Sequence, residues 1–115
     1  MLKGILVTQF GANVAELSGK LEGYYKALEC DTIDIVSRNI GGEYYDIVCD
    51  DEGLFKENFV SMICEVTLEP MLVGNLFICR HNRRGNEVSL TADDVTNILA
   101  HCVRGPHGFV VKGGY

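Results

Sequence analysis

One short segment carries the only concentrated positive charge of this chain, and its residue types suit phosphate binding. It is Arg80-His81-Asn82-Arg83-Arg84-Gly85-Asn86, directly after a long apolar run. Arginine binds phosphate through a planar fork of N–H donors. If the fold brings Tyr44 or Tyr45 near Arg80, Arg83 and Arg84, the segment predicts a pocket for a small phosphorylated or nucleotide signal. The alternative is a solvated loop between a strand and a helix.

A second cluster, Asp50-Asp51-Glu52-Gly53, is acidic. Clustered carboxylates suit Mg²⁺ and Ca²⁺, but the alternating spacing and the distal glutamate of a calcium-binding loop are missing. We therefore expect no metal here, and interpret the cluster as a solvated turn or as a surface that binds a protein. In the second case Asp46, Asp50, Asp51 and Glu52, together with Asp31, Asp34 and Glu43, would imitate a phosphate backbone.

Signatures of common enzyme classes are missing from the sequence. It has no GxSxG, Walker A, GxGxxG or HExxH motif. Its five cysteines are spaced 15 to 23 residues apart without a CxxC pair, which favours buried, reduced thiols over disulfides or zinc. We therefore expect a non-enzymatic protein with no catalytic residues, no metal and no cofactor.

Composition restricts the class of protein further. A chain of 115 residues with 47% hydrophobic residues is long enough for one domain, residues 1–115, with a real core. The net charge of −6, with nine acids and two basic residues between Glu29 and Glu57, disfavours nonspecific DNA binding. No apolar run approaches the ~20 residues of a membrane span, and Met1 to Val7 is too short for a signal peptide. We expect a cytoplasmic protein in a bacterial host cell.

The hydropathy pattern predicts the elements that would position these clusters. Apolar runs of strand length predict strands over 2–8 and 71–79. Alternation predicts a strand over 59–68 and a hairpin over 32–49 with its turn at 39–42. Helical spacing predicts a helix over 14–29 capped by Asn13, and a second helix capped by Thr91. The order predicts a single α+β domain with a mostly antiparallel sheet of about four to six strands and two helices packed on one face.

Three segments in this order resemble a known family. They are Ile47 to Leu54 (IVCDDEGL), Leu72 to Ile78 (LVGNLFI) and Ser89 to Val95 (SLTADDV). Their sequence and spacing are similar to the uncharacterised family catalogued as domain of unknown function 3846. The likeness covers about 2–100, so 103–115 is a C-terminal extension beyond it.

The resemblance implies a small protein of bacteriophages and other mobile elements. Proteins of this kind often antagonise host defences by binding. We therefore expect a non-enzymatic binding protein that blocks a host bacterial protein; the alternative is a sponge that sequesters a small phosphorylated or nucleotide signal through the arginine-rich segment. A homodimer or higher oligomer is expected in either case, with Phe109-Val110-Val111 as an edge that pairs with another strand.

Overall fold

The chain folds into short strands and two α-helices. The computed structural model describes residues 1–56 and 58–115. In chain order the elements are β1 (Leu2–Thr8), β2 (Gly11–Leu17), α1 (Leu21–Leu28), β3 (Ile33–Ile40), β4 (Glu43–Asp50), the 3-10 helix η1 (Gly53–Phe55), β5 (Val60–Cys64), β6 (Pro70–Val73), β7 (Leu76–His81), β8 (Glu87–Val88), α2 (Ala92–Ala100), β9 (Cys102–Arg104) and β10 (Phe109–Gly113).

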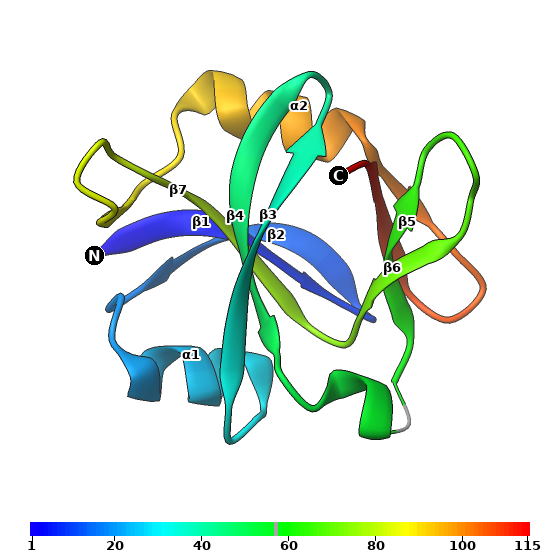
Figure 1. Ribbon diagram of the computed structural model, residues 1–115, viewed down its shortest axis with the longest axis horizontal. Coiled ribbons are helices and arrows are strands. Elements are labelled where there is room, and N and C mark those ends of the chain that lie inside the picture. The colour runs from blue at the N-terminus through cyan, green and yellow to red at the C-terminus, as the bar shows by residue number, and fades with distance from the viewer. Residues whose placement is uncertain (57) are drawn as a thin grey trace.

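The strands form two sheets (Figure 1). The larger sheet has the order β2-β1-β7-β4-β3, with β8 beside β7, and the smaller has the order β6-β5-β10-β9. Neighbouring strands are antiparallel except for β5 and β10. The predicted single α+β domain with mostly antiparallel strands is therefore confirmed.

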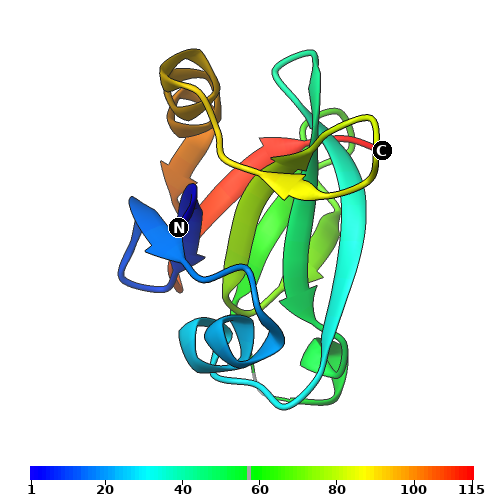
Figure 2. The same ribbon diagram turned by 90° about the vertical axis from the view of Figure 1, so that its left-hand side faces the viewer.

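The two helices lie on opposite faces of the larger sheet, so the prediction that both pack on one face is wrong. Tyr24 of α1 packs in a cluster with Val48 and Phe77, whereas Ile98 of α2 belongs to a second cluster that contains Ile47. Successive residues of a strand point to opposite faces, and the neighbours Ile47 and Val48 therefore separate the two clusters. Figure 2 shows the helices well apart, with α1 below and α2 at the top.

The second half of strand β2 occupies the start of the segment for which the sequence predicts one helix over 14–29. Only Leu21–Leu28 is helical, and the N-cap is Lys20 rather than Asn13. Strand β2 instead forms a hairpin with β1, in a register that pairs Leu2 with Leu17. The apolar residues that suggested one helical face are divided between an edge strand, where Val14 is exposed, and a short helix.

The apolar run 71–79 forms two strands rather than the one central strand predicted. Gly74 has a φ of 81° and turns the chain between β6 and β7, in a left-handed conformation that glycine adopts without steric cost. Strand β6 pairs with β5 in the smaller sheet, whereas β7 lies between β1 and β4 in the larger. The strand predicted over 59–68 also ends early, at Cys64. The turn at Gly74 therefore carries the chain from one sheet to the other.

The predicted hairpin is confirmed as β3 and β4. The strands pair from Ile33 with Asp50 to Ile40 with Glu43. Gly41 and Gly42 form the turn with φ values of 60° and 89°, which suit the tight turns that join antiparallel strands. This hairpin forms one edge of the larger sheet, because β3 is the last strand in its order.

The C-terminal strand lies inside the smaller sheet, so the prediction that Phe109-Val110-Val111 forms a free edge is wrong. Strand β10 pairs with β5 on one side and β9 on the other, and Val111 is fully buried. After β10, Asn39 and Gly114 exchange two backbone hydrogen bonds of 2.9 Å. These bonds join the two sheets at the end of β3.

Candidate functional site

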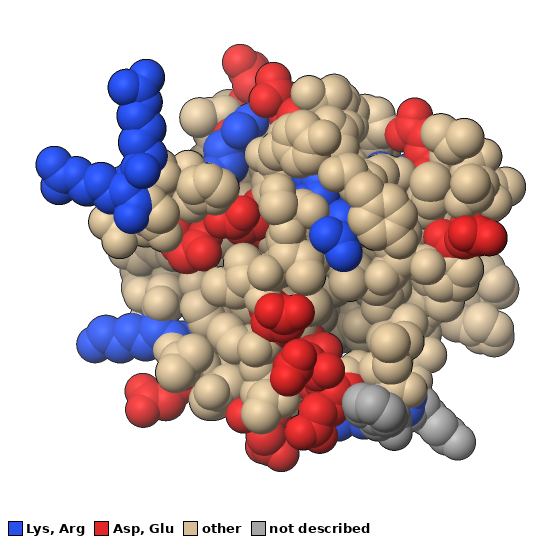
Figure 3. All heavy atoms as spheres, in the orientation of Figure 1, with Lys and Arg blue, Asp and Glu red and all other residues tan. Residues whose placement is uncertain are grey.

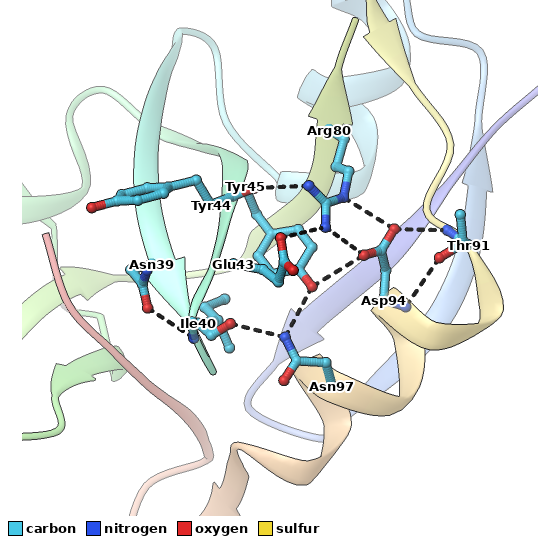
Figure 4. Close-up of polar contacts among 10 residues, drawn as sticks. Asn39, Ile40, Glu43, Tyr44, Tyr45, Arg80, Thr91, Asp94 and Asn97 are labelled. Atoms are coloured by element: carbon cyan, nitrogen blue, oxygen red, sulfur yellow. Dashed lines mark hydrogen bonds and ion pairs between the residues drawn. The ribbon is translucent and has the colours of Figure 1, made fainter.

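Arg80 lies on strand β7 rather than in a loop. It continues the alternating series of Leu76 and Ile78, whose side chains belong to the cluster beneath α2. Its guanidinium binds Asp94 of α2 at two points, with Nη2–Oδ1 and Nε–Oδ2 distances of 2.7 and 3.1 Å (Figure 4). This is the paired geometry that arginine forms with carboxylates. The face of Arg80 that would bind phosphate is therefore occupied by a carboxylate of the protein itself.

Other groups of β4 complete the surroundings of Arg80. Nη2 lies 3.3 Å from Oε2 of Glu43, Nη1 lies 3.4 Å from the carbonyl oxygen of Tyr44, and the guanidinium carbon is 4.6 Å from the centre of the Tyr45 ring. The hydrogen bonds to Asp94 raise the pKa of Arg80, and the same contact lowers the pKa of Asp94 to about 2. The charge of Arg80 is balanced by two carboxylates.

Asp94 also begins helix α2. The Thr91 hydroxyl accepts a hydrogen bond from the Asp94 N–H at 3.2 Å, and Asp94 Oδ2 accepts one from the Thr91 N–H at 3.0 Å. This capping box confirms Thr91 as the N-cap. The Tyr45 hydroxyl donates to Asp94 Oδ1 at 3.2 Å and accepts from Nδ2 of Asn97, which also donates to the Ile40 carbonyl at 2.8 Å (Figure 4). The network fastens α2 to β3, β4 and β7.

The residues predicted to bind phosphate do not form one pocket. Arg83 and Arg84 are exposed in the turn between β7 and β8, in the corner where Figure 3 shows long basic side chains extending into solvent. Tyr45 is buried at 1% exposure beneath Arg80, whereas Tyr44 points to the other face of β4 and is 57% exposed. The alternation of β4 separates the two tyrosines, and the strand position of Arg80 separates it from the other two arginines.

The opposite face of the sheet holds a cluster of ionisable groups that the sequence did not indicate. His81 Nδ1 lies 2.8 Å from Oδ2 of the buried Asp46, and the Cys79 thiol donates to Oε2 of Glu87 at 3.2 Å. Burial raises the pKa of Cys79 and, together with Asp46, the pKa of Glu87. The thiol is therefore held in its protonated form, which is a poor nucleophile. The register that pairs Asp46 with Cys79 creates this cluster, and a single sequence does not reveal a register.

The four acidic residues predicted to bind a partner occupy different environments. Asp46 is buried against His81, and Asp50 forms an ion pair of 2.7 Å with Lys56. Asp51 and Glu52 are exposed, as are Asp31 and Asp34 nearby. We refer to Asp31, Asp34, Asp51 and Glu52 as the acidic face. In Figure 3 acidic side chains gather at the lower centre of the molecule.

A groove of about 230 Å³ lies between the edge strand β3 and the edge strand β6. Apolar side chains from both sheets line it, among them Val36, Leu72 and Val73. Asp34 and Asp51 lie at the same groove. The two sheets are joined by the backbone bonds between Asn39 and Gly114, and among the described residues β3 and β6 do not pair with each other.

A polar cavity of about 360 Å³ lies between the β1–β2 turn, the end of α1 and the β6–β7 turn. Lys26 and Lys56 line it, but so do Glu29 and Asp50, and Lys56 is paired with Asp50. The balanced charges give the cavity no preference for an anion.

Within residues 1–56 and 58–115, no three histidine, cysteine, aspartate or glutamate side chains gather in a way that could hold a metal ion. The described helices are too short to cross a membrane.

Comparison with known proteins gives one result. A family model described as "Domain of unknown function (DUF3846)" matches residues 2–102. The resemblance noted from the sequence is therefore confirmed, and the matched region ends before strand β10. No curated protein and no solved structure matches the chain.

Proposed function

The chain belongs to the DUF3846 family, and we propose that it is a non-enzymatic binding protein that blocks a protein partner through its acidic face. The observation that carries this proposal is the grouping of exposed carboxylates at the end of the β3–β4 hairpin that lies opposite the Gly41-Gly42 turn. Asp34, Asp50 and Asp51 line one groove, and among the described residues only Asp50 has an ion-pair partner there, Lys56.

Unpaired carboxylates grouped on one surface favour a basic partner. Such a surface accelerates encounter with a positively charged protein and disfavours acidic ones. The net charge of −6 acts in the same direction over the whole molecule. The partner we propose is therefore a protein with a basic surface.

The biological setting that we propose is the one the family resemblance implies. The protein would be made by a phage or another mobile element, act in the cytoplasm of the bacterial host, and antagonise a host defence by occupying the basic surface of a defence protein.

The geometry favours this proposal over sequestration of a phosphorylated or nucleotide signal. A sponge of the predicted kind needs Arg80, Arg83 and Arg84 to converge on one ligand. Arg80 is instead paired with Asp94 and Glu43, while the other two arginines project from an exposed turn.

Charge-neutralised variants test the proposal by affinity capture from bacterial lysate. The test variant is Asp34→Asn with Asp51→Asn and Glu52→Gln. A matched control removes three exposed carboxylates elsewhere, with Glu16→Gln, Glu22→Gln and Asp93→Asn.

We expect the wild type and the control to retain a partner at low salt and to release it at high salt, and the test variant to capture none. Equal capture by both variants contradicts the proposal. A thermal shift with a nucleotide panel that is lost in the double variant Arg83→Ala, Arg84→Ala supports the sponge instead. Turnover of a phosphoester or a peptide by the purified protein overturns both.

A further inference from the structure

The outer edge of β3 is free of backbone pairing over most of its length. In an antiparallel strand the N–H and C=O groups of alternate residues point to the same side. The N–H and C=O of Asn39 bind Gly114 on the outer side of β3. The N–H and C=O groups of Ile33, Ile35 and Ser37 therefore also point to the outer side. Among the described residues, β3 pairs along its length with β4 alone.

The side chains of β3 partly occupy this edge. Asp34 Oδ1 accepts a hydrogen bond of 2.9 Å from the Ile35 N–H, and Arg38 Nη1 donates one of 2.8 Å to the Ser37 carbonyl. Both are contacts with an adjacent residue at an exposed position, which a partner strand can replace. The remaining outward groups, such as the Ser37 N–H and the Ile35 carbonyl, have no backbone partner among the described residues.

The groove between β3 and β6 offers an added strand apolar and acidic side chains to contact. Its apolar lining includes Val36, Cys49 and Leu72, and the carboxylates of Asp34 and Asp51 stand at the same place. A strand that lies along β3 directs alternate side chains toward this lining, which includes the carboxylates of Asp34 and Asp51, and the others toward the opposite face of the sheet.

We infer that β3 accepts an extended segment of a protein partner as an additional strand, and that this segment carries both apolar and basic residues. The inference rests on the proposed function, because it specifies how the blocked partner docks. The free edge from Ile33 to Ser37 accommodates about five residues of partner, or roughly 16 Å of extended chain. Addition of a strand to a sheet edge is an established mode of peptide recognition, in which backbone hydrogen bonds supply affinity and side-chain pockets supply specificity. A second copy of this chain fits less well, since it would bring another charge of −6 to the acidic face.

A synthetic peptide of alternating lysine and valine, labelled with fluorescein, tests the inference by fluorescence anisotropy. In an extended peptide the N–H groups of all valines point to one edge and those of all lysines to the other. We therefore expect N-methylation of one of these two sets to weaken binding at least about tenfold, because backbone hydrogen bonds to β3 are lost. An alternating glutamate–valine peptide is expected not to bind.

Substitutions at Ser37 provide the matched protein test. Ser37→Pro removes an outward N–H that β4 does not use, and edge strands tolerate proline. We expect binding of the lysine–valine peptide to weaken at least about tenfold, whereas Ser37→Ala, which retains the N–H, binds like the wild type. Circular dichroism checks that Ser37→Pro is folded, and the N-methylated peptides test the same hydrogen bonds without changing the protein.

Several results overturn strand addition. These are binding that neither N-methylated set weakens, or binding that Ser37→Pro leaves unchanged. If the captured partner is retained by Ser37→Pro but lost by the charge-neutralised variant, the acidic face binds the partner without strand addition, and the proposed function stands. If the wild type is a dimer that Ser37→Pro converts to a monomer, the edge is occupied by a second copy, and the inference is wrong.

Discussion

Neutralising Asp94 tests the view that its pairing with Arg80 fastens helix α2 to the sheet. The side chain of Asp94 is 8% exposed, and its pKa is lowered from 3.8 to about 2, chiefly by the hydrogen bonds from Arg80. One pKa unit corresponds to about 1.4 kcal/mol, so this shift amounts to about 2 kcal/mol of folding free energy. We expect Asp94→Asn to lower the free energy of unfolding in urea at pH 7 by about that amount.

The neighbouring Asp93 supplies a matched control. It lies in the same first turn of α2 but is exposed. Asp93→Asn removes the same charge from the helix N-terminus without breaking the contact with Arg80, and we expect it to cost less than about 0.5 kcal/mol. Equal losses for Asp93→Asn and Asp94→Asn would show that the helix dipole, rather than the ion pair, accounts for the effect.

The dependence on pH follows from the direction of the shift. The pKa of Asp94 is lower in the folded protein than in the unfolded chain, so its stabilisation is complete above pH about 4 and disappears as the pH falls through about 2. The difference in unfolding free energy between wild type and Asp94→Asn should therefore stay constant from pH 7 to 5 and shrink from pH 4 to 2. A difference that persists unchanged at pH 2 refutes the assignment. In a double-mutant cycle, Arg80→Gln and Asp94→Asn should be non-additive by at least about 0.5 kcal/mol.

Three further predictions concern other parts of the fold. At pH 8, iodoacetamide should modify Cys64 before Cys79 in the native protein, as mapped by mass spectrometry, because hydrogen bonds from Thr67 lower the pKa of Cys64 whereas burial raises that of Cys79; equal rates would contradict this order. A chain ending at Arg104 lacks β10 and should lose cooperative thermal unfolding, rather than merely change its oligomeric size. Gly41→Ala should destabilise the protein about 1–3 kcal/mol more than Gly42→Ala in urea titrations, since both residues have positive φ but only the Cβ at position 41 would clash with Asn97; equal losses would show that the contact is unimportant.

The elements that sequence predicts best are those fixed by local chemistry. The β3–β4 hairpin follows from alternation up to a Gly-Gly turn, and the start of α2 follows from Thr91 and Asp94 at capping-box spacing. In both cases residues within a few positions of each other determine the outcome. Neither prediction required knowledge of the rest of the molecule.

The elements that sequence missed depend on partners far along the chain. The sequence predicts helix for residues 14–17 of β2 because a helical period continues across two separate elements, through Val14, Leu17, Leu21, Tyr24 and Leu28. What makes residues 11–17 extended is the full ladder with β1. The turn at Gly74 was missed for a similar reason, because an apolar run of strand length gives no sign that its two halves belong to different sheets.

The position of Arg80 was partly predictable. The clustering of Arg80 with Arg83 and Arg84 suggested one basic loop, but the alternation of Leu76 and Ile78 already placed Arg80 on a strand and toward the core. An arginine facing the core requires a carboxylate partner. Asp94, fourteen residues later in the first turn of a predicted helix, is that partner, but Glu87 and Asp93 lie nearer in the sequence and the sequence does not choose among them. The Asp46–His81 contact depends on the register of β4 against β7 and was not predictable in this way.

Strand β3 is paired on its outer side at Asn39, whereas its outer edge from Ile33 to Ser37 has no strand partner among the described residues. This difference explains why binding is proposed at the Ile33 end of the hairpin. At Asn39 the strand is tied to Gly114, and there Arg38 stacks on the Tyr115 ring at 4.9 Å, so the two sheets are locked together. Asp34 lies on the part of β3 from Ile33 to Ser37 whose outer edge has no strand partner among the described residues. An exposed edge strand ordinarily promotes aggregation, and proteins protect such edges with charge. Charge alone would account for the carboxylates. A groove with an apolar lining beside them is not needed for protection, and for that reason we assign this edge to a partner.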